Sequence, residues 1–140
     1  MAVTYQLEQR ENKLTETGGK KFYARCVKTG VMTFDNICAI IADRGTATKG
    51  DALVVIDGFL HTMLQGLREG RIIDLNDFGR FQISVSSKGS EKSEEFNPAL
   101  ITRSRILFRP GKSLRDMLKT LQFASNGVVK TLKSDDAAGV

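Results

Sequence analysis

The apolar positions along this chain change their period several times, and each period predicts a different element. Residues 3–9 and 21–28 alternate between apolar and polar side chains around a polar stretch at 12–19, which predicts a β-hairpin. After that, apolar side chains recur at helical spacing in two stripes, which predict two helices: Phe34, Ile37, Cys38 and Ile41, then Leu53, Ile56, Leu60, Met63 and Leu67.

Local signals give the ends of these two helices. Thr33 is a candidate N-cap of the first helix, and Gly45 a candidate stop. Thr48 and Asp51 have the spacing of a capping box at the start of the second helix, which we expect to end at Gly70. A turn this short predicts a helical hairpin.

Two apolar residues of the second helix, Val55 and Phe59, lie off its main stripe. A helix with apolar side chains on more than one face usually has more than one partner. We therefore expect a dimer interface here.

The second half of the chain returns to strand patterns. Residues 71–75, 81–85 and 100–108 predict strands, with a polar excursion at 88–97, and residues 114–121 predict a short amphipathic helix after Pro110-Gly111. We expect disorder from Ser134 to Val140. The expected organisation is an N-terminal hairpin at 1–30, a domain at 31–122 and a C-terminal tail at 123–140.

Basic residues gather around the last predicted strand and helix. Arg103 and Arg105 are two positions apart and share one strand face, while Ile106 and Phe108 share the other. Positive charge continues past the strand at Arg109, Lys112, Arg115 and Lys119. With a net charge of +5 and a pI near 9.4, this pattern favours an anionic partner, although solvated surface charges would give the same pattern.

The start of the last helix is a candidate phosphate site. Lys112 lies where the helix begins, so its charge would add to free backbone N–H groups. Gly111 before it allows a close approach of the backbone.

Several classes of protein are not expected. The chain has no apolar run of membrane-spanning length and no secretory signal at its start, so we expect no membrane contact. Cys26 and Cys38 are expected to be buried free thiols in a reducing compartment, the cytoplasm. With His61 as its one histidine and no phosphate-binding or nucleophile motif, the chain offers no catalytic residue, no metal site and no site for a cofactor or small-molecule substrate. We therefore do not expect an enzyme.

Three glycine-containing segments carry a resemblance to a known family. Glu69-Gly70-Arg71, Asp77-Phe78-Gly79-Arg80-Phe81 and Phe108-Arg109-Pro110-Gly111-Lys112, together with the helical hairpin, resemble the HU/integration host factor family of bacterial histone-like proteins from about Thr33 to Leu121. Tyr5 and the segment 20–24 resemble an HU-related branch found in Bacteroides-type bacteria.

The resemblance implies a fold and a function. The fold is α+β and IHF-like: a helical hairpin, a three-stranded sheet with a β-ribbon arm and a C-terminal helix, here with an added N-terminal β-hairpin. The function is largely sequence-independent binding of double-stranded DNA in the nucleoid by a homodimer, whose two ribbon arms reach around the minor groove and bend the DNA. The residues carried over as DNA contacts are Arg80, Lys88, Lys92, Arg103, Arg105, Arg109, Gly111, Lys112 and Arg115.

The arm tip departs from the family's pattern. The resemblance makes Pro98 the candidate intercalating residue, whereas its sequence context favours a turn or strand-edge proline. Glu91, Glu94 and Glu95 place negative charge where phosphates would approach. These acids leave open a second function, a protein-interaction or structural module on the same fold with weak or no DNA binding.

Overall fold

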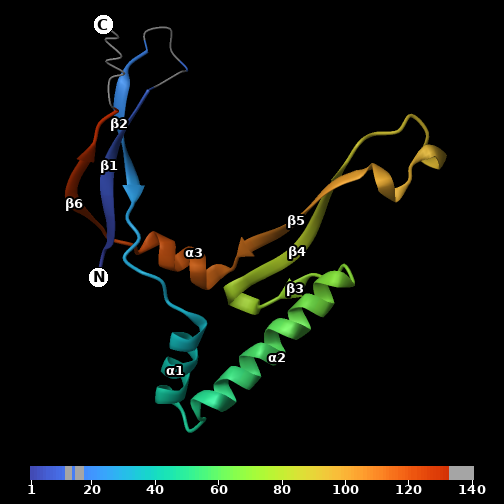
Figure 1. Cartoon of the computed structure of the whole chain (residues 1–140), viewed down its shortest axis with the longest axis horizontal. Helices are drawn as coiled ribbons and strands as arrows, with labels where there is room; N and C mark the ends of the chain where they lie inside the picture. Colours follow the sequence, from blue (N-terminus) through green and yellow to red (C-terminus); the bar gives the residue numbers. More distant parts are fainter. Residues whose placement is uncertain (12–13, 15–17, 133–140) are drawn as a thin grey trace, which may run out of the picture. The chain divides into compact units, whose positions relative to one another are not determined.

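The computed structural model describes residues 1–11, 14 and 18–132, which divide into two compact units (Figure 1). One unit combines the two ends of the chain, and the other runs from Met32 to Lys119. The polar loop expected at 12–19 lies mostly outside the described residues, and the disorder expected for Ser134–Val140 lies entirely outside them.

The terminal unit is a three-stranded sheet with the first strand in its centre. β1 (Val3–Glu11) pairs antiparallel with β2 (Lys20–Cys26) and parallel with β6 (Phe123–Lys130). The predicted N-terminal hairpin is therefore present. β6 was not predicted, because its alternation is interrupted by Asn126-Gly127, where Gly127 has φ +76° and the pairing register shifts.

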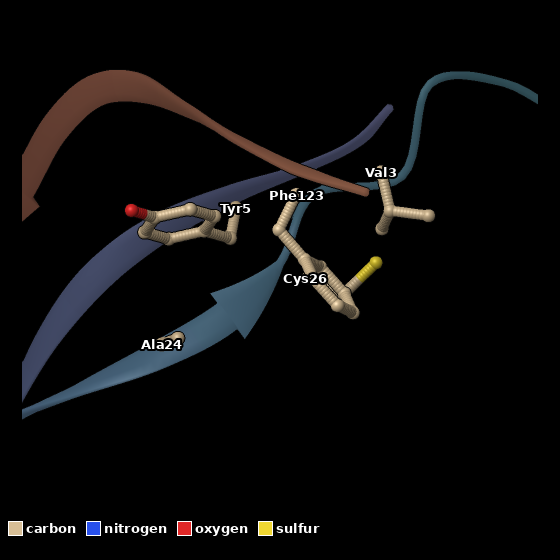
Figure 2. Close-up of a pocket in the computed structure, with 5 residues that line it drawn as sticks. All are labelled: Val3, Tyr5, Ala24, Cys26 and Phe123. Atoms are coloured by element: carbon tan, nitrogen blue, oxygen red, sulfur yellow. The ribbon is translucent and has the colours of Figure 1, made fainter. Parts of the chain in front are cut away.

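One face of this sheet carries a shallow apolar pocket of about 340 Å³ (Figure 2). It is lined by Val3, Tyr5, Ala24, Cys26 and Phe123. The expectation that both thiols are buried is wrong for Cys26, which is exposed on the edge strand β2, whereas Cys38 is buried.

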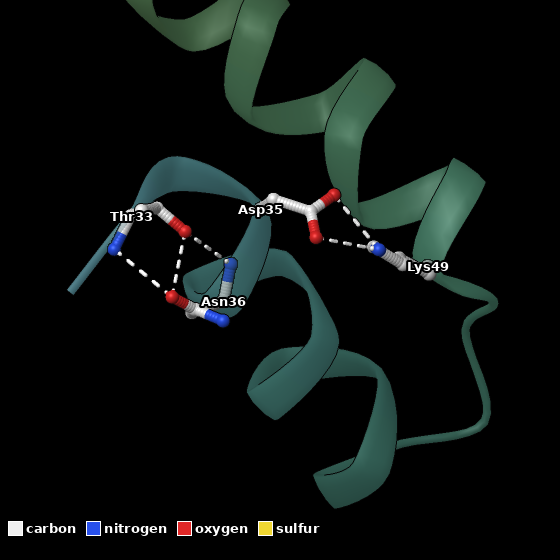
Figure 3. A network of polar contacts seen from close by, with 4 residues as sticks. All are labelled: Thr33, Asp35, Asn36 and Lys49. Carbon is white, nitrogen blue, oxygen red and sulfur yellow. Dashed lines mark hydrogen bonds and ion pairs between the residues drawn. The ribbon is translucent and has the colours of Figure 1, made fainter.

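The second unit begins with the helical hairpin, α1 (Phe34–Arg44) and α2 (Lys49–Arg68). Both N-caps are as predicted. Thr48 and Asp51 form the expected capping box, and Thr33 forms a second one with Asn36, whose backbone N–H donates to Thr33 Oγ1 at 3.2 Å (Figure 3). An ion pair between Lys49 Nζ and Asp35 Oδ1, 2.7 Å apart, joins the two helix starts.

A second three-stranded sheet follows, in which β4 (Gly79–Ser87) lies between β3 (Ile73–Asp74) and β5 (Ile101–Pro110). The strand predicted at 71–75 is reduced to two residues, because the Arg71 N–H still bonds the Gly66 carbonyl at the end of α2. α2 packs against β3 and β4, and α3 (Lys112–Lys119) packs against β5 and the turn η1 (Asn76–Phe78). Two short 3-10 turns, η2 (Ser93–Glu95) and η3 (Pro98–Leu100), lie between β4 and β5.

The chain thus has the α+β fold expected of it, but little apolar core. Among the described residues, only Cys38, Ala52 and Leu67 are buried apolar side chains. Within the same ranges, no helix is long and apolar enough to cross a membrane.

The capping box of α2 predicts a pH dependence. Hydrogen bonds from Thr48 lower the pKa of Asp51 below its ordinary value of 3.8. The ionised carboxylate therefore stabilises the folded state above the pKa of the unfolded chain, and this stabilisation is lost as the pH falls through the lower, folded-state pKa. We expect the wild type to exceed Asp51→Asn in free energy of unfolding by a constant amount at neutral pH, and by progressively less below pH 3.8. Urea unfolding over a pH series measures this difference, and a difference that does not change with pH would contradict it.

Candidate nucleic-acid interface

β4 and β5 form a ribbon with two chemically different faces. The register pairs Arg80 with Arg109, Ser84 with Arg105, and Ser86 with Arg103. Paired residues point to the same side of a sheet, so all four arginines share one face with small polar side chains. We call this set the polar ribbon face: Arg80, Gln82, Ser84, Ser86, Arg103, Arg105, Leu107 and Arg109.

The other face of the ribbon is apolar. Phe81 pairs with Phe108, with ring centroids 4.6 Å apart, and Ile83 pairs with Ile106. Phe78 adds a third ring, 5.9 Å from Phe108. The register between β4 and β5 fixes which way the arginines point, because a shift of one residue would exchange the faces.

At the base of the ribbon, two glycines let separate backbone segments touch. A Cβ on Gly111 would overlap the Asp77 carbonyl and lie 2.9 Å from the Gly79 nitrogen. Gly79 itself has φ +147°, and a Cβ there would lie 2.5 Å from the Arg109 carbonyl oxygen. We call this contact between residues 76–80 and 109–112 the glycine junction.

Hydrogen bonds fasten the glycine junction. The Gly111 N–H donates to the Phe78 carbonyl at 2.9 Å, and the Leu75 N–H donates to the Gly79 carbonyl at 2.9 Å. Asn76 turns the chain with φ +54°, a conformation that asparagine tolerates better than most residues, and its N–H donates to Asp74 Oδ1 at 2.9 Å. The start of α3 is thereby held against the base of the ribbon.

The glycine junction surrounds a surface pocket of about 270 Å³ rich in cations. The first intrahelical bond of α3 runs from the Arg115 N–H to the Gly111 carbonyl, so the N–H groups before it have no partner within the helix. The pocket, which we call the junction pocket, is lined by Asn76, Asp77, Gly79, Arg80, Arg109, Pro110, Gly111, Lys112 and Arg115.

Most of these cations are unpaired. Arg80 Nη2 lies 3.0 Å from Asp74 Oδ2, so its charge is partly neutralised. Within residues 1–11, 14 and 18–132, no ion pair is formed by the remaining cations of the site: Arg103, Arg105, Arg109, Lys112 and Arg115. An anion with several charges could therefore engage them without breaking an internal contact.

The structure does not bring every candidate residue together. Lys88 and Lys92 lie at the tip of the ribbon, a strand length of nine residues from the junction pocket, or about 30 Å. Pro98 occupies the first position of the 3-10 turn η3, whose N-cap Asn97 accepts a bond from the Ala99 N–H at 2.9 Å. The proline is therefore a turn residue in the free protein.

The sequence analysis assigned no role in the site to four residues that the structure brings into it. Asn76 and Asp77 line the junction pocket, and Ser84 and Ser86 flank the arginines. The strand predicted at 81–85 places alternate residues on one face, but only the register shows that Ser84 and Ser86 lie on the arginine face.

Comparison with known proteins places this arrangement in a family. Residues 1–125 match the family model described as HU domain fused to wHTH, Ig, or Glycine-rich motif, HU-HIG. The chain belongs to the HU-HIG family. The matched range contains the two strands of the N-terminal hairpin as well as the ribbon and the helices. This family is not a class of enzymes, in agreement with the sequence analysis.

Single proteins show the same relationship at a greater distance. The chain is 31% identical over 87 residues to DNA-binding protein HRm of Rhizobium meliloti, covering 61% of this chain and 97% of HRm. It is 24% identical over 90 residues to DNA-binding protein HU of Thermotoga maritima, covering 63% of this chain and all of that protein. Each of these two matches covers less than two thirds of this chain.

A solved structure shares the fold over most of the chain. It is a protein from Bacteroides vulgatus with the provisional description of a bacterial DNA-binding protein, and the TM-score is 0.60 at 15% identity. The match covers 91% of this chain but only 50% of the other, so this chain spans half of that protein's length. The likeness shows the fold alone.

The glycine junction predicts a strong effect of one methyl group. In Gly111→Ala the added Cβ meets backbone, which cannot move aside as a side chain would. We expect the free energy of unfolding to fall by at least about 2 kcal/mol. Gly89→Ala is the control, because a Cβ there meets nothing within 4 Å, and its effect should stay within about 0.5 kcal/mol. Equal stability of the two variants in urea unfolding would contradict the account of the glycine junction.

Proposed function

We propose that this protein binds double-stranded DNA without strong sequence preference, as a homodimer. The observation that carries the proposal is the ribbon register, which gathers Arg80, Arg103, Arg105 and Arg109 on one face that leads into the junction pocket. The names of the HU and HRm relatives support it, as does HU-HIG membership. We place this activity in the cytoplasm, at the nucleoid.

Binding would come mainly from the phosphate backbone. Arginines on the polar ribbon face neutralise phosphates, and the small serines between them allow the ribbon to lie close to a groove wall. At the junction pocket, Lys112, Arg115 and the free N–H groups at the start of α3 hold a further phosphate. Such contacts position the protein without reading bases.

The dimer is proposed from the apolar surface of the helical hairpin. On α2, Val54, Val55 and Leu64 are 69%, 70% and 54% exposed. An apolar pocket of about 240 Å³ between the two helices is also open, and Val55 helps to line it. Exposed apolar surface on this scale indicates an interaction surface, and a second copy would supply the missing core. Two copies also supply two ribbons, which can bend a duplex held between them.

A charge-reversal pair tests the DNA contact. We expect Lys112→Glu with Arg115→Glu to weaken binding to every duplex sequence alike, because the lost contacts are to phosphate. In the wild type, affinity should fall steeply between about 50 and 200 mM salt. Fluorescence anisotropy on random-sequence duplexes over a salt series measures both effects.

The matched control for this pair is Arg44→Glu with Arg68→Glu, which reverses the same charge at the ends of α1 and α2. Wild-type affinity in the Lys112/Arg115 variant would contradict the proposed contact. If the wild type gave no gel shift with micromolar protein at low salt, the result would favour the second function, which is a protein-interaction module. The exposed acids at the ribbon tip would then serve protein contacts: Glu91, Glu94 and Glu95.

Dimerisation predicts that thermal stability depends on protein concentration. Because the folded dimer would unfold to two chains, Tm should rise with concentration. We expect Val55→Asp to yield monomer or to lose cooperative unfolding, whereas Asp57→Ala, an exposed polar position on the same helix, should leave the dimer intact. Light scattering after size exclusion reports the mass. A monomeric wild type with a concentration-independent Tm would rule out the dimer.

A further inference from the structure

The sheet of the terminal unit, like the ribbon, has two chemically unlike faces. Alternation along β1 and β2 and the register with β6 put apolar side chains on one face, where Tyr5 lies opposite Cys26 and Val3 opposite Phe123. Glu8 marks the other face, because it pairs with Tyr23 on one side and with Lys130 on the other. We call this second set the basic sheet face: Arg10, Lys21, Tyr23, Arg25 and Lys130, with Glu8 among them.

Glu8 is the one carboxylate on this face among the residues that the structure describes, and it does not cancel the positive charge of the face. Glu8 lies 3.2 Å from Arg10 Nη2 and 3.3 Å from Arg25 Nη1, so one negative charge is shared between two guanidinium groups. The hydrogen bond from Arg10, with a further contribution from Arg25, lowers the pKa of Glu8, so this group is ionised at neutral pH. In the described part of the chain, Lys21 and Lys130 form no ion pair, and they add to the remaining positive charge.

One end of this face is hollowed. A surface pocket of about 340 Å³ lies there, lined by residues of β1, of β6 and of the segment 25–28 at the end of β2. Its three cations are Arg25, Lys28 and Lys130. Gln6 on the central strand adds an amide group. Among the described residues that line this pocket there is no carboxylate, so an anionic group could be held between the three cations.

The balance of charge also differs between the two units. In Met32–Lys119, 13 lysines and arginines stand against 11 acidic residues. The described residues of the terminal unit have six lysines and arginines against two glutamates: Arg10, Lys20, Lys21, Arg25, Lys28 and Lys130 against Glu8 and Glu11. The smaller unit therefore carries the larger positive excess.

We propose that the basic sheet face, with its pocket at Arg25, Lys28 and Lys130, is a second contact for the phosphate backbone of double-stranded DNA. This inference rests on the proposed function, because the same duplex would be the ligand. The cations are spread over three strands, and this suits an extended polyanion better than a small anion, which would use the pocket alone. Tyr23, 43% exposed among these cations, offers a hydroxyl to a phosphate or sugar.

Removing two cations of the pocket tests this proposal in the full-length chain. Lys28→Gln with Lys130→Gln removes charge without reversing it and disturbs no ion pair among the described residues. Each phosphate contact contributes roughly 0.9 to the slope of log K against log salt concentration, so the slope should become shallower by about 2 for each protomer that contacts the duplex. Anisotropy with a random-sequence duplex over a salt series measures this slope, and circular dichroism checks the fold.

The matched control, Arg44→Gln with Arg68→Gln, removes the same charge from the ends of α1 and α2 and should leave the slope unchanged. A slope for Lys28→Gln with Lys130→Gln equal to that of the wild type would overturn the second contact, while the proposed function would stand if Lys112→Glu with Arg115→Glu still lost affinity. If instead the wild type failed to bind the duplex, the proposed function and this inference would both fall. Inorganic phosphate could instead raise the Tm of the wild type but not that of the Lys28/Lys130 variant, while the salt slope of the variant stays unchanged. That result would indicate a site for a small anion and would also overturn the proposal.

Discussion

The close approach of two backbone segments at the glycine junction is the constraint on which the geometry of the proposed DNA-binding site depends. Gly111 lies against the turn that ends at Gly79, and neither position has room for a side chain. Because this contact fastens the start of α3 to the base of β4 and β5, Lys112 and Arg115 continue the line of arginines on the polar ribbon face. Without it, the helix and the ribbon would carry their charges independently, and no junction pocket would form.

The same division of faces recurs through the molecule. The ribbon separates arginines from packed phenylalanine rings, and the terminal sheet separates lysines and arginines from the pocket around Tyr5 and Phe123. In both places cations lie on a regular surface rather than in a deep cleft, which suits a repeating polyanion better than a small molecule. The exposed apolar residues of α2 support the proposed dimer, since a second copy would bury them and double the number of ribbons.

Local signals in the sequence predicted local structure well. The two helices begin where Thr33 and Thr48 cap them, because a cap depends on residues three positions apart. The shared face of Arg103 and Arg105 followed from strand period alone. What depends on distant pairing was not predicted: β6, whose partner lies at the other end of the chain, the match of Ser84 and Ser86 with these arginines, and the exposure of Cys26. The glycine motifs indicated a site, but only the folded backbone shows that Asn76 and Asp77 help to form it.

The most direct measurement of the central claim is an NMR titration of the full-length, ¹⁵N-labelled protein with a random-sequence duplex at low salt. If the polar ribbon face and the glycine junction contact phosphates, the largest changes in amide shifts should fall on β4, β5 and the first turn of α3, with Gly111 and Lys112 among the most affected. Saturable shifts confined to other parts of the chain, with β4, β5 and α3 unchanged, would contradict the account.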